Sequence, residues 1–346
     1  MLLAVSSIEQ SYGPYMRPAS GGDAAIAPAS GGALLAWSES YRIRVGLLDS
    51  RARLVSAIHE LPTTKEKASA MAPIAAFDGS SFLLAWNERV VDKDQTMAMF
   101  VAADGTPSGT MLPVGGPGPI NGDPSLRLVW DGASYRLWNG RHAFQIARDG
   151  TVLVTSAGAR PDAVTATNGV VGTTSFTSTG GGSCGGPFKF CRLYPTVTWT
   201  IGTRVGWYQV TDRPSPATIA AAGDHFAVAW TTPTLITYLI VDGALNHVAA
   251  TPDITVAPGL ACDETQCLLA YSQSGDVHAL AFPVDRLYGP EMLTIAATER
   301  TERVPQVHLL GPDRFLVTYR SDGLDGQKLN GRIVTFDATT RRRSMR

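Results

Sequence analysis

The sequence predicts an all-β protein, a seven-bladed β-propeller of four-stranded antiparallel blades. One pattern, an apolar strand that ends in an aromatic residue, recurs with a period of about 48 residues. Turn residues such as Asp-Gly stand before and after most copies, and no helical periodicity occurs. The chain of 346 residues has 35 glycines and 22 prolines but only 17% charged residues, so turns are abundant and long charged helices are scarce.

The strand that ends in an aromatic residue occurs in six plain copies. They lie at residues 33–37, 82–86, 135–138, 226–230, 267–271 and 315–319. A seventh, degenerate copy is needed between Trp138 and Trp230, and we place it at residues 170–177, with Phe176 as the aromatic. Because a large flat side chain recurs at the same strand end, we expect these aromatics to pack each blade against the next, with stacking on a ligand as the alternative.

Each copy belongs to a meander of four strands, and the meanders together form one propeller domain over residues 1–346. Six or eight blades are the alternatives to seven. The expected blades lie at 24–70, 71–122, 123–160, 161–214, 215–256, 257–302 and 303–346.

The last blade shows only three strands, at 305–310, 314–319 and 330–336. An open blade would leave an unpaired edge, which folded proteins avoid. We therefore expect the N-terminal strand, within residues 1–10, to close the ring, with residues 2–8 paired to 330–336 as the outermost strand.

The four cysteines form two local pairs, Cys184 with Cys191 and Cys262 with Cys267. The second pair flanks four polar residues between apolar runs, which is hairpin spacing, and facing residues of antiparallel strands lie within reach of a disulfide. We predict both disulfides, with unpaired buried thiols and a zinc site of all four cysteines as alternatives. Disulfides indicate an extracytoplasmic protein, secreted or at the cell surface, although the chain shows no signal peptide.

The overall charge and hydropathy exclude two classes of partner. A net charge of −1 provides no basic field for a phosphate backbone, so we expect no nucleic-acid partner. The longest apolar stretches have about seven residues, far short of a membrane span. We expect a monomer.

The pattern aromatic-Leu-Leu/Val-Ala-Trp-x-Glu/Asp, preceded by Asp-Gly, resembles the repeat of secreted seven-bladed propellers of myxobacteria and related bacteria, over about residues 24–337. This resemblance implies a secreted bacterial propeller but no particular activity, because propellers serve as lectins, adhesins, scaffolds, lyases and hydrolases. The fourth repeat departs from the pattern through a Gly-rich insertion at residues 179–187.

Charged residues recur shortly after the strand-ending aromatics, in loops of variable length, where rigid scaffolds tend to carry binding residues. The candidate ligand-binding residues are Glu39, Glu88, Arg89, Arg141, Arg320 and Asp322. We expect them to surround the mouth of the central channel as a polar funnel. The alternative is that they are solvated or ion-paired loop charges.

The favoured function is a non-catalytic recognition propeller that binds a glycan or a protein on its loop-rich face. The alternative is a carbohydrate-active enzyme, a polysaccharide lyase or glycoside hydrolase, with acid and base groups in the funnel. Its catalytic candidates are Glu39, Glu88, His142 and Asp322. We expect no cofactor and no metal; calcium is the alternative, with Asp92, Asp94, Asp322 and Asp325 as candidate ligands.

Overall fold

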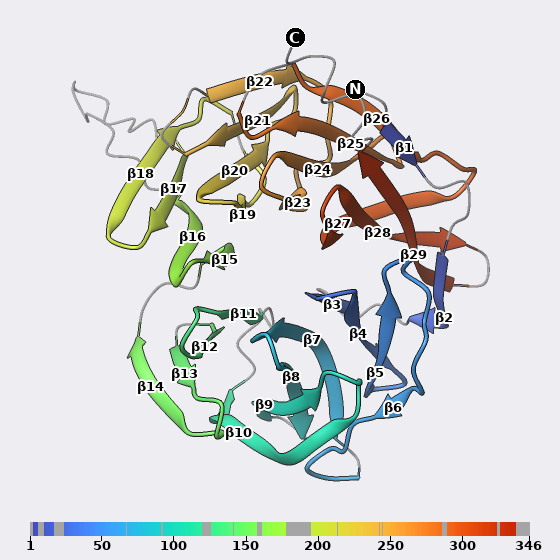
Figure 1. Cartoon of the computed structure of the whole chain (residues 1–346), viewed down its shortest axis with the longest axis vertical. Coiled ribbons are helices and arrows are strands. Elements are labelled where there is room, and N and C mark those ends of the chain that lie inside the picture. Colours follow the sequence, from blue (N-terminus) through green and yellow to red (C-terminus); the bar gives the residue numbers. More distant parts are fainter. Residues whose placement is uncertain are drawn as a thin grey trace, which may run out of the picture. The chain divides into compact units, whose positions relative to one another are not determined.

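The protein is all-β and has the seven four-stranded antiparallel blades of a seven-bladed β-propeller, as predicted (Figure 1). The computed structural model describes residues 3–5, 10–16, 24–66, 68–90, 93–119, 126–140, 142–157, 161–177, 195–212, 214–241, 243, 245–285, 289–323 and 326–336. The chain divides into two compact units, one of Met1–Arg160 with His308–Arg346 and the other of Pro161–Val307.

The first unit contains the first three blades and most of the last. The first blade has β3 (Ala24–Ala29), β4 (Gly32–Glu39), β5 (Arg42–Asp49) and β6 (His59–Glu60). The second has β7 (Ser69–Phe77), β8 (Ser81–Val90), β9 (Lys93–Ala102) and β10 (Pro107–Pro119). The third has β11 (Leu126–Trp130), β12 (Tyr135–Asn139), β13 (His142–Ile146) and β14 (Val152–Ala157).

The second unit contains the fourth, fifth and sixth blades. The fourth has β15 (Ala163–Thr167), β16 (Val170–Thr177), β17 (Thr196–Ile201) and β18 (Arg204–Gln209). The fifth has β19 (Thr218–Ala222), β20 (His225–Thr231), β21 (Leu235–Ile240) and β22 (Leu245–Ala249). The sixth has β23 (Gly259–Cys262), β24 (Gln266–Gln273), β25 (Asp276–Pro283) and β26 (Glu291–Ala296).

The last blade draws strands from both ends of the sequence. Its strands β27 (Thr301–Gly311), β28 (Arg314–Gly323) and β29 (Gly326–Phe336) follow the predicted three-strand pattern but are longer. The strand β1 (Leu3–Val5) pairs antiparallel with the end of β29, with Leu3 opposite Phe336. This confirms the predicted N-terminal strand. The strand β2 (Gln10–Met16), which was not predicted, extends the pairing along the beginning of β29.

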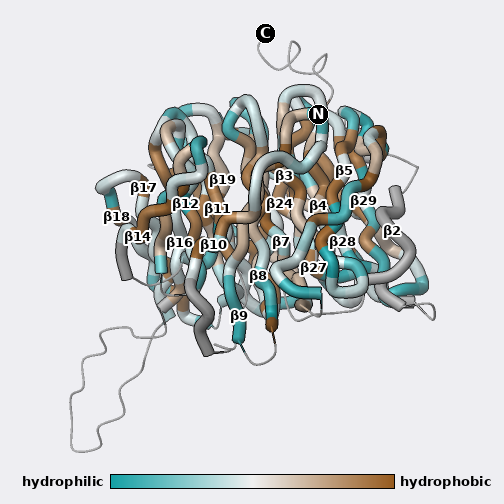
Figure 2. Tube along the Cα trace, turned by 90° about the horizontal axis from the view of Figure 1, so that it is seen from below, coloured by the Kyte–Doolittle hydropathy of each residue, from teal (hydrophilic) through white to brown (hydrophobic). Residues whose placement is uncertain are grey.

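The hydrophobic residues lie in the bodies of the strands and the hydrophilic residues at the turns, as Figure 2 shows for β4 and β24. The aromatic residues that end the repeated strands are fully or largely buried in five repeats: Trp37, Trp86, Trp230, Tyr271 and Tyr319. Trp138 and Phe176 are partly exposed. Trp37, Trp86, Trp230 and Tyr271 lie in clusters that also contain residues of a neighbouring blade, which is the packing role predicted for them.

Buried aspartates fix the tight turns between first and second strands. Asp78 accepts backbone N–H bonds from Ser80 at 2.7 Å and Ser81 at 2.8 Å. It also pairs with Arg148 of the third blade, whose Nε lies 3.0 Å from Oδ2. Burial raises the pKa of Asp78, but these hydrogen bonds and the Arg148 charge outweigh burial and hold the pKa below its ordinary value. The turn therefore depends on an ionised carboxylate.

The predicted disulfide between Cys262 and Cys267 is present. The two residues face each other across β23 and β24, with their Cα atoms 4.0 Å apart and their sulfurs 2.01 Å apart. The pair closes the hairpin where Asp263 makes the turn. The other predicted pair, Cys184 and Cys191, and the Gly-rich insertion at 179–187 lie outside the described residues.

Candidate functional site

Several segments that the sequence indicated as loops are hairpins of paired strands. The strand β8 continues past Trp86 to Val90 and pairs with β9 up to Lys93, so Glu88 and Arg89 lie on a strand. In the same way β28 continues through Arg320 and Asp322 to Gly323, opposite Gly326. Strand pairing satisfies the backbone N–H and C=O groups of these segments, although their polar residues are typical of loops. The expectation that they are loops was therefore wrong.

Glu88 is buried, with 0% of its surface exposed, rather than facing solvent. Its Oε1 accepts a hydrogen bond from the backbone N–H of Thr64 at 2.8 Å and another from the Thr64 hydroxyl. Gln95 donates to that hydroxyl at 3.0 Å. Thr64 lies on the connection from the first blade to the second, so Glu88 fastens this connection to the second blade.

Glu39 and Arg89 each form ion pairs within their own blade. Glu39 Oε2 lies 3.1 Å from Arg44 Nη1 and accepts from the Trp37 indole N–H at 3.4 Å. Arg89 holds Asp94 through two bonds, Nε to Oδ1 at 2.8 Å and Nη2 to Oδ2 at 3.2 Å. This hydrogen bond raises the pKa of Arg89 against the opposing effect of burial. Asp94, a candidate calcium ligand, is thus held by an arginine.

The remaining candidates are spread over other strands of the first unit. His142 is an exposed residue at the start of β13, and Arg320 and Asp322 are partly exposed on β28. Arg141, Asp92 and Asp325 lie outside the described residues. In the described part of the chain, no group of three or more His, Cys, Asp or Glu side chains could hold a metal ion. Glu39 and Arg89 are ion-paired within their own blades, and Glu88 bonds to Thr64 through Oε1 while its buried Oε2 has no hydrogen-bond partner among the described residues.

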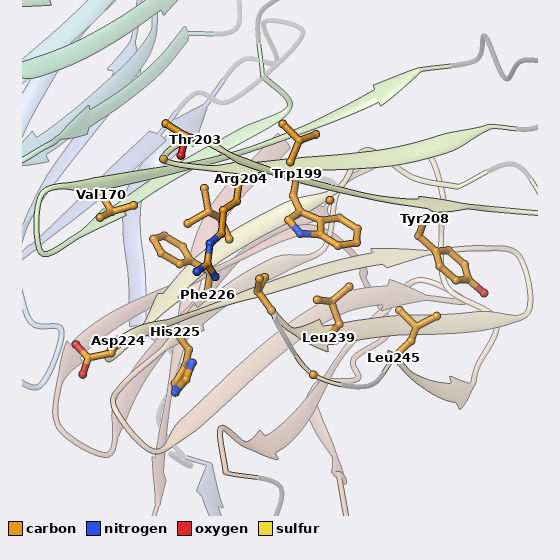
Figure 3. Close-up of a pocket in the computed structure, with 16 residues that line it drawn as sticks. Val170, Trp199, Thr203, Arg204, Tyr208, Asp224, His225, Phe226, Leu239 and Leu245 are labelled. Atoms are coloured by element: carbon orange, nitrogen blue, oxygen red, sulfur yellow. The ribbon is translucent and has the colours of Figure 1, made fainter.

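The second unit contains a groove between its fourth and fifth blades, with a volume of about 1050 Å³. Its wall on the fourth blade is formed by β17, β18 and the turn between them, with Val170 of β16. Its wall on the fifth blade comes from β20, β21 and the turns at their ends, with Leu245 of β22. Its aromatic and polar lining includes Trp199, Arg204, Tyr208, Asp224 and His225. Figure 3 shows Asp224 and His225 together at one end, Tyr208 at the other, and Trp199 and Arg204 between them.

The local sequence explains why the Trp199 indole lies over the neighbouring strand at Gly206. Trp199 is the cross-strand neighbour of Gly206, and a Cβ at Gly206 would lie 2.3 Å from the indole. Only glycine leaves room for the ring at this position. Tyr208 packs near Trp230, with ring centroids 5.7 Å apart, which joins the groove wall to the core between the two blades.

The polar end of the groove is also positioned by hydrogen bonds. The side-chain amide of Asn168 donates to Asp224 Oδ1 at 2.9 Å, and the Thr167 hydroxyl donates to the carbonyl of Gly223 at 3.2 Å. These bonds connect the first turn of the fourth blade to that of the fifth. Among the described residues, the groove therefore combines the aromatic rings of Trp199, Tyr208 and Phe226 with one cation, one carboxylate and one imidazole, a composition suited to binding.

The groove was not predicted from the sequence. Its residues come from the degenerate fourth repeat and the turns of the fifth, so no repeated motif marks them. The available signal was the cluster of aromatic residues Trp199, Trp207 and Tyr208 within the repeat that departs most from the pattern.

No protein-family model and no curated protein sequence matches the chain. Among solved structures, a prolyl endopeptidase matches with a TM-score of 0.49 and 15% identity, over 86% of this chain and 45% of its own. Trypanosoma rangeli sialidase in complex with sialic acid matches with a TM-score of 0.45 and 9% identity, over 99% of this chain and 60% of its own. A GH43 endo-arabinanase from Bacillus licheniformis gives a TM-score of 0.38 and 13% identity, over 92% of this chain and 95% of its own. The chain thus spans about half the length of the first two, and these likenesses assign no activity to it.

Proposed function

We propose that the protein is a non-catalytic recognition propeller that binds a glycan in the groove between its fourth and fifth blades. The observation that carries this proposal is the pairing of aromatic and polar groups there. Sugar rings present a face of C–H groups, which stacks on flat aromatic surfaces such as Trp199 and Tyr208, and a rim of hydroxyls, which bonds to charged groups such as Arg204.

The charges of the groove favour binding over catalysis. Glycoside hydrolysis generally uses two carboxyl groups on opposite sides of the scissile bond. Among the described residues that line the groove, Asp224 is the one carboxylate, and it accepts a hydrogen bond from Asn168. In the first unit, Glu88 Oε1 accepts from Thr64 and Asp94 is paired with Arg89.

We also propose an extracytoplasmic location for this recognition module. The Cys262–Cys267 disulfide is typical of oxidising compartments. In the described residues, no helix has the length and hydrophobicity to cross a bilayer.

The proposal is tested with a glycan array on the full chain, followed by calorimetric titration of the best glycan. Arg204→Ala should weaken binding roughly tenfold or more, because hydrogen bonds to charged groups contribute about 1.5–3 kcal/mol. Arg300→Ala, a change at an exposed arginine of the same unit outside the groove, is the matched control and should bind like the wild type. Equal binding by wild type and the Arg204 and Tyr208 alanine variants would refute the groove as the site. Release of cleaved sugars from a bound glycan would instead favour the enzyme alternative.

A further inference from the structure

The strand β18 is the outermost strand of the fourth blade, and no described strand covers its outer edge. The order of the sheet is β15, β16, β17, β18, and among the described strands none pairs with β18 on its other side. An outermost strand presents unpaired N–H and C=O groups, which can pair with another chain unless the edge is protected.

The register of the sheet shows which backbone groups face outward. In an antiparallel pair, residues that exchange hydrogen bonds alternate with residues whose N–H and C=O point away from the neighbour. Val210 donates its N–H to the carbonyl of Pro195 at 2.8 Å, one step beyond the pairing of β17 with β18. Every second residue before Val210, that is Tyr208 and Gly206, also bonds toward β17. The residues between them, Val205, Trp207 and Gln209, therefore direct their backbone groups to the open edge.

The outermost strands of the other blades, except β22, carry features that interrupt an edge. The strand β6 has two residues, and the pairings of β10, β14 and β26 contain register shifts. In the last blade, β1 has three residues and β2 contains a register shift. The strand β22 is regular but has no large exposed apolar side chain.

By contrast, β18 pairs with β17 without a register shift and exposes large apolar side chains. Val205 and Trp207 are each 66% exposed, and they lie two residues apart, so their side chains project from the same face of the strand. From Val205 to Gln209 the strand has no charged residue and no proline, the usual protections of an edge.

We propose that β18 pairs antiparallel with β18 of a second copy of this chain, so that a reversible two-fold dimer forms through a continuous sheet of eight strands. The strand is complementary to itself. A two-fold axis at Gly206 places Val205 opposite the partner's Trp207 and Trp207 opposite the partner's Val205, two favourable pairs of an aromatic with a β-branched residue. The outward backbone groups of these residues then meet in matching positions, and Gly206 contributes no side chain at the axis.

The charge of the chain does not oppose this association. The net charge is −1, so two copies repel each other weakly, and no like charges face each other between Val205 and Gln209. The dimer goes beyond the proposed glycan binding and replaces the monomer expected from the sequence. Val205 lines the groove but Trp207 does not, so Trp207→Lys is the variant that tests the dimer separately from glycan binding.

The test is sedimentation velocity on the full chain over a concentration series from micromolar to several hundred micromolar. We expect the wild type to shift from monomer to dimer. Trp207→Lys should raise the concentration needed for dimers at least tenfold, whereas Val154→Lys should leave it unchanged. Val154 is the matched control because it is 70% exposed on β14, an outermost strand with a register shift.

A second variant separates loss of pairing from loss of folding. Val205→Pro removes an N–H that faces the open edge and leaves the bonds from β18 to β17 in place, so it should remain folded and monomeric. Hydrogen exchange of the amides of Val205, Trp207 and Gln209 should slow as the wild-type concentration rises. The proposal is overturned if the wild type stays monomeric at every concentration, if these amides are protected in the monomer, if Trp207→Lys dimerises like the wild type, or if assemblies larger than a dimer form.

Discussion

Replacement of Trp86 by alanine removes one of the two largest fully buried side chains of the described structure. Trp86 is 0% exposed and packs in a cluster with Ala36 and Ile43 of the first blade and Met97 of the second. A buried indole of roughly 200 Å² at about 25 cal/mol per Å² corresponds to about 5 kcal/mol of transfer free energy. Substitutions of buried tryptophan by alanine generally cost about 3–5 kcal/mol, and we expect a loss near 4 kcal/mol.

A second substitution, Trp86→Phe, tests whether the loss comes from packing. The indole Nε1 of Trp86 is buried without an acceptor among the described residues. An unsatisfied buried donor costs about 1–3 kcal/mol, so phenylalanine removes a destabilising group while keeping most of the apolar contact. We therefore expect Trp86→Phe to change the free energy of unfolding by less than about 1.5 kcal/mol.

The assay is urea unfolding followed by far-UV circular dichroism, with Leu153→Ala as the control. Leu153 is an exposed residue of the same unit, and its replacement should change stability by less than about 0.5 kcal/mol. The packing role of Trp86 would be refuted if Trp86→Ala lost less than about 1 kcal/mol, or if Trp86→Phe were as damaging as Trp86→Ala.

Three further predictions concern the last blade, the disulfide and the turns. Deletion of residues 1–16 should lower the melting temperature and promote aggregation, because it uncovers the outer edge of β29. A truncated chain with the same melting temperature as the full chain would contradict this. Reduction of the Cys262–Cys267 disulfide should cost about 2 kcal/mol by loop entropy, measured by urea unfolding with and without reductant; an unchanged midpoint would show that the link contributes nothing. Because folding lowers the pKa of Asp78, the ionised carboxylate contributes fully to the free energy of unfolding well above pH 4, and this contribution is lost as the pH falls through the folded-state pKa. Asp78→Asn should therefore flatten the acid side of a plot of stability against pH. A plot parallel to that of the wild type would refute this role.

The repeats made most of the fold predictable, because packing between blades selects the same residue types at the same place in each blade. A strand ending such as Leu84-Ala85-Trp86 recurs because it packs against a neighbouring blade. A turn such as Asp78-Gly79 recurs because it joins two antiparallel strands. The N-terminal strand was predictable because the last repeat was one strand short. The strand β2 was not, since Gly13 and Pro14 indicate a break and its pairing depends on β29, over 300 residues away.

The candidate site was harder to predict, because side-chain environment depends on neighbours that the local sequence does not specify. Glu88 has the sequence context of a loop charge, yet its role is set by Thr64 on the preceding connection. The groove depends on an aromatic ring beside a glycine, Trp199 beside Gly206, which are seven residues apart along the chain and meet only through the hairpin.

The pairing of β1 with β29 has a consequence for how the chain folds as it is synthesised. Leu3 meets Phe336, so about 330 residues must emerge before the N-terminal strand has its partner. At roughly 5–20 residues per second, β1 would wait between about 15 and 65 seconds on a translating ribosome. Closing a loop of this length costs about 3 kcal/mol more than closing a loop of ten residues. The last blade should therefore form late, and the N-terminal strand is the segment that a chaperone would have most time to bind.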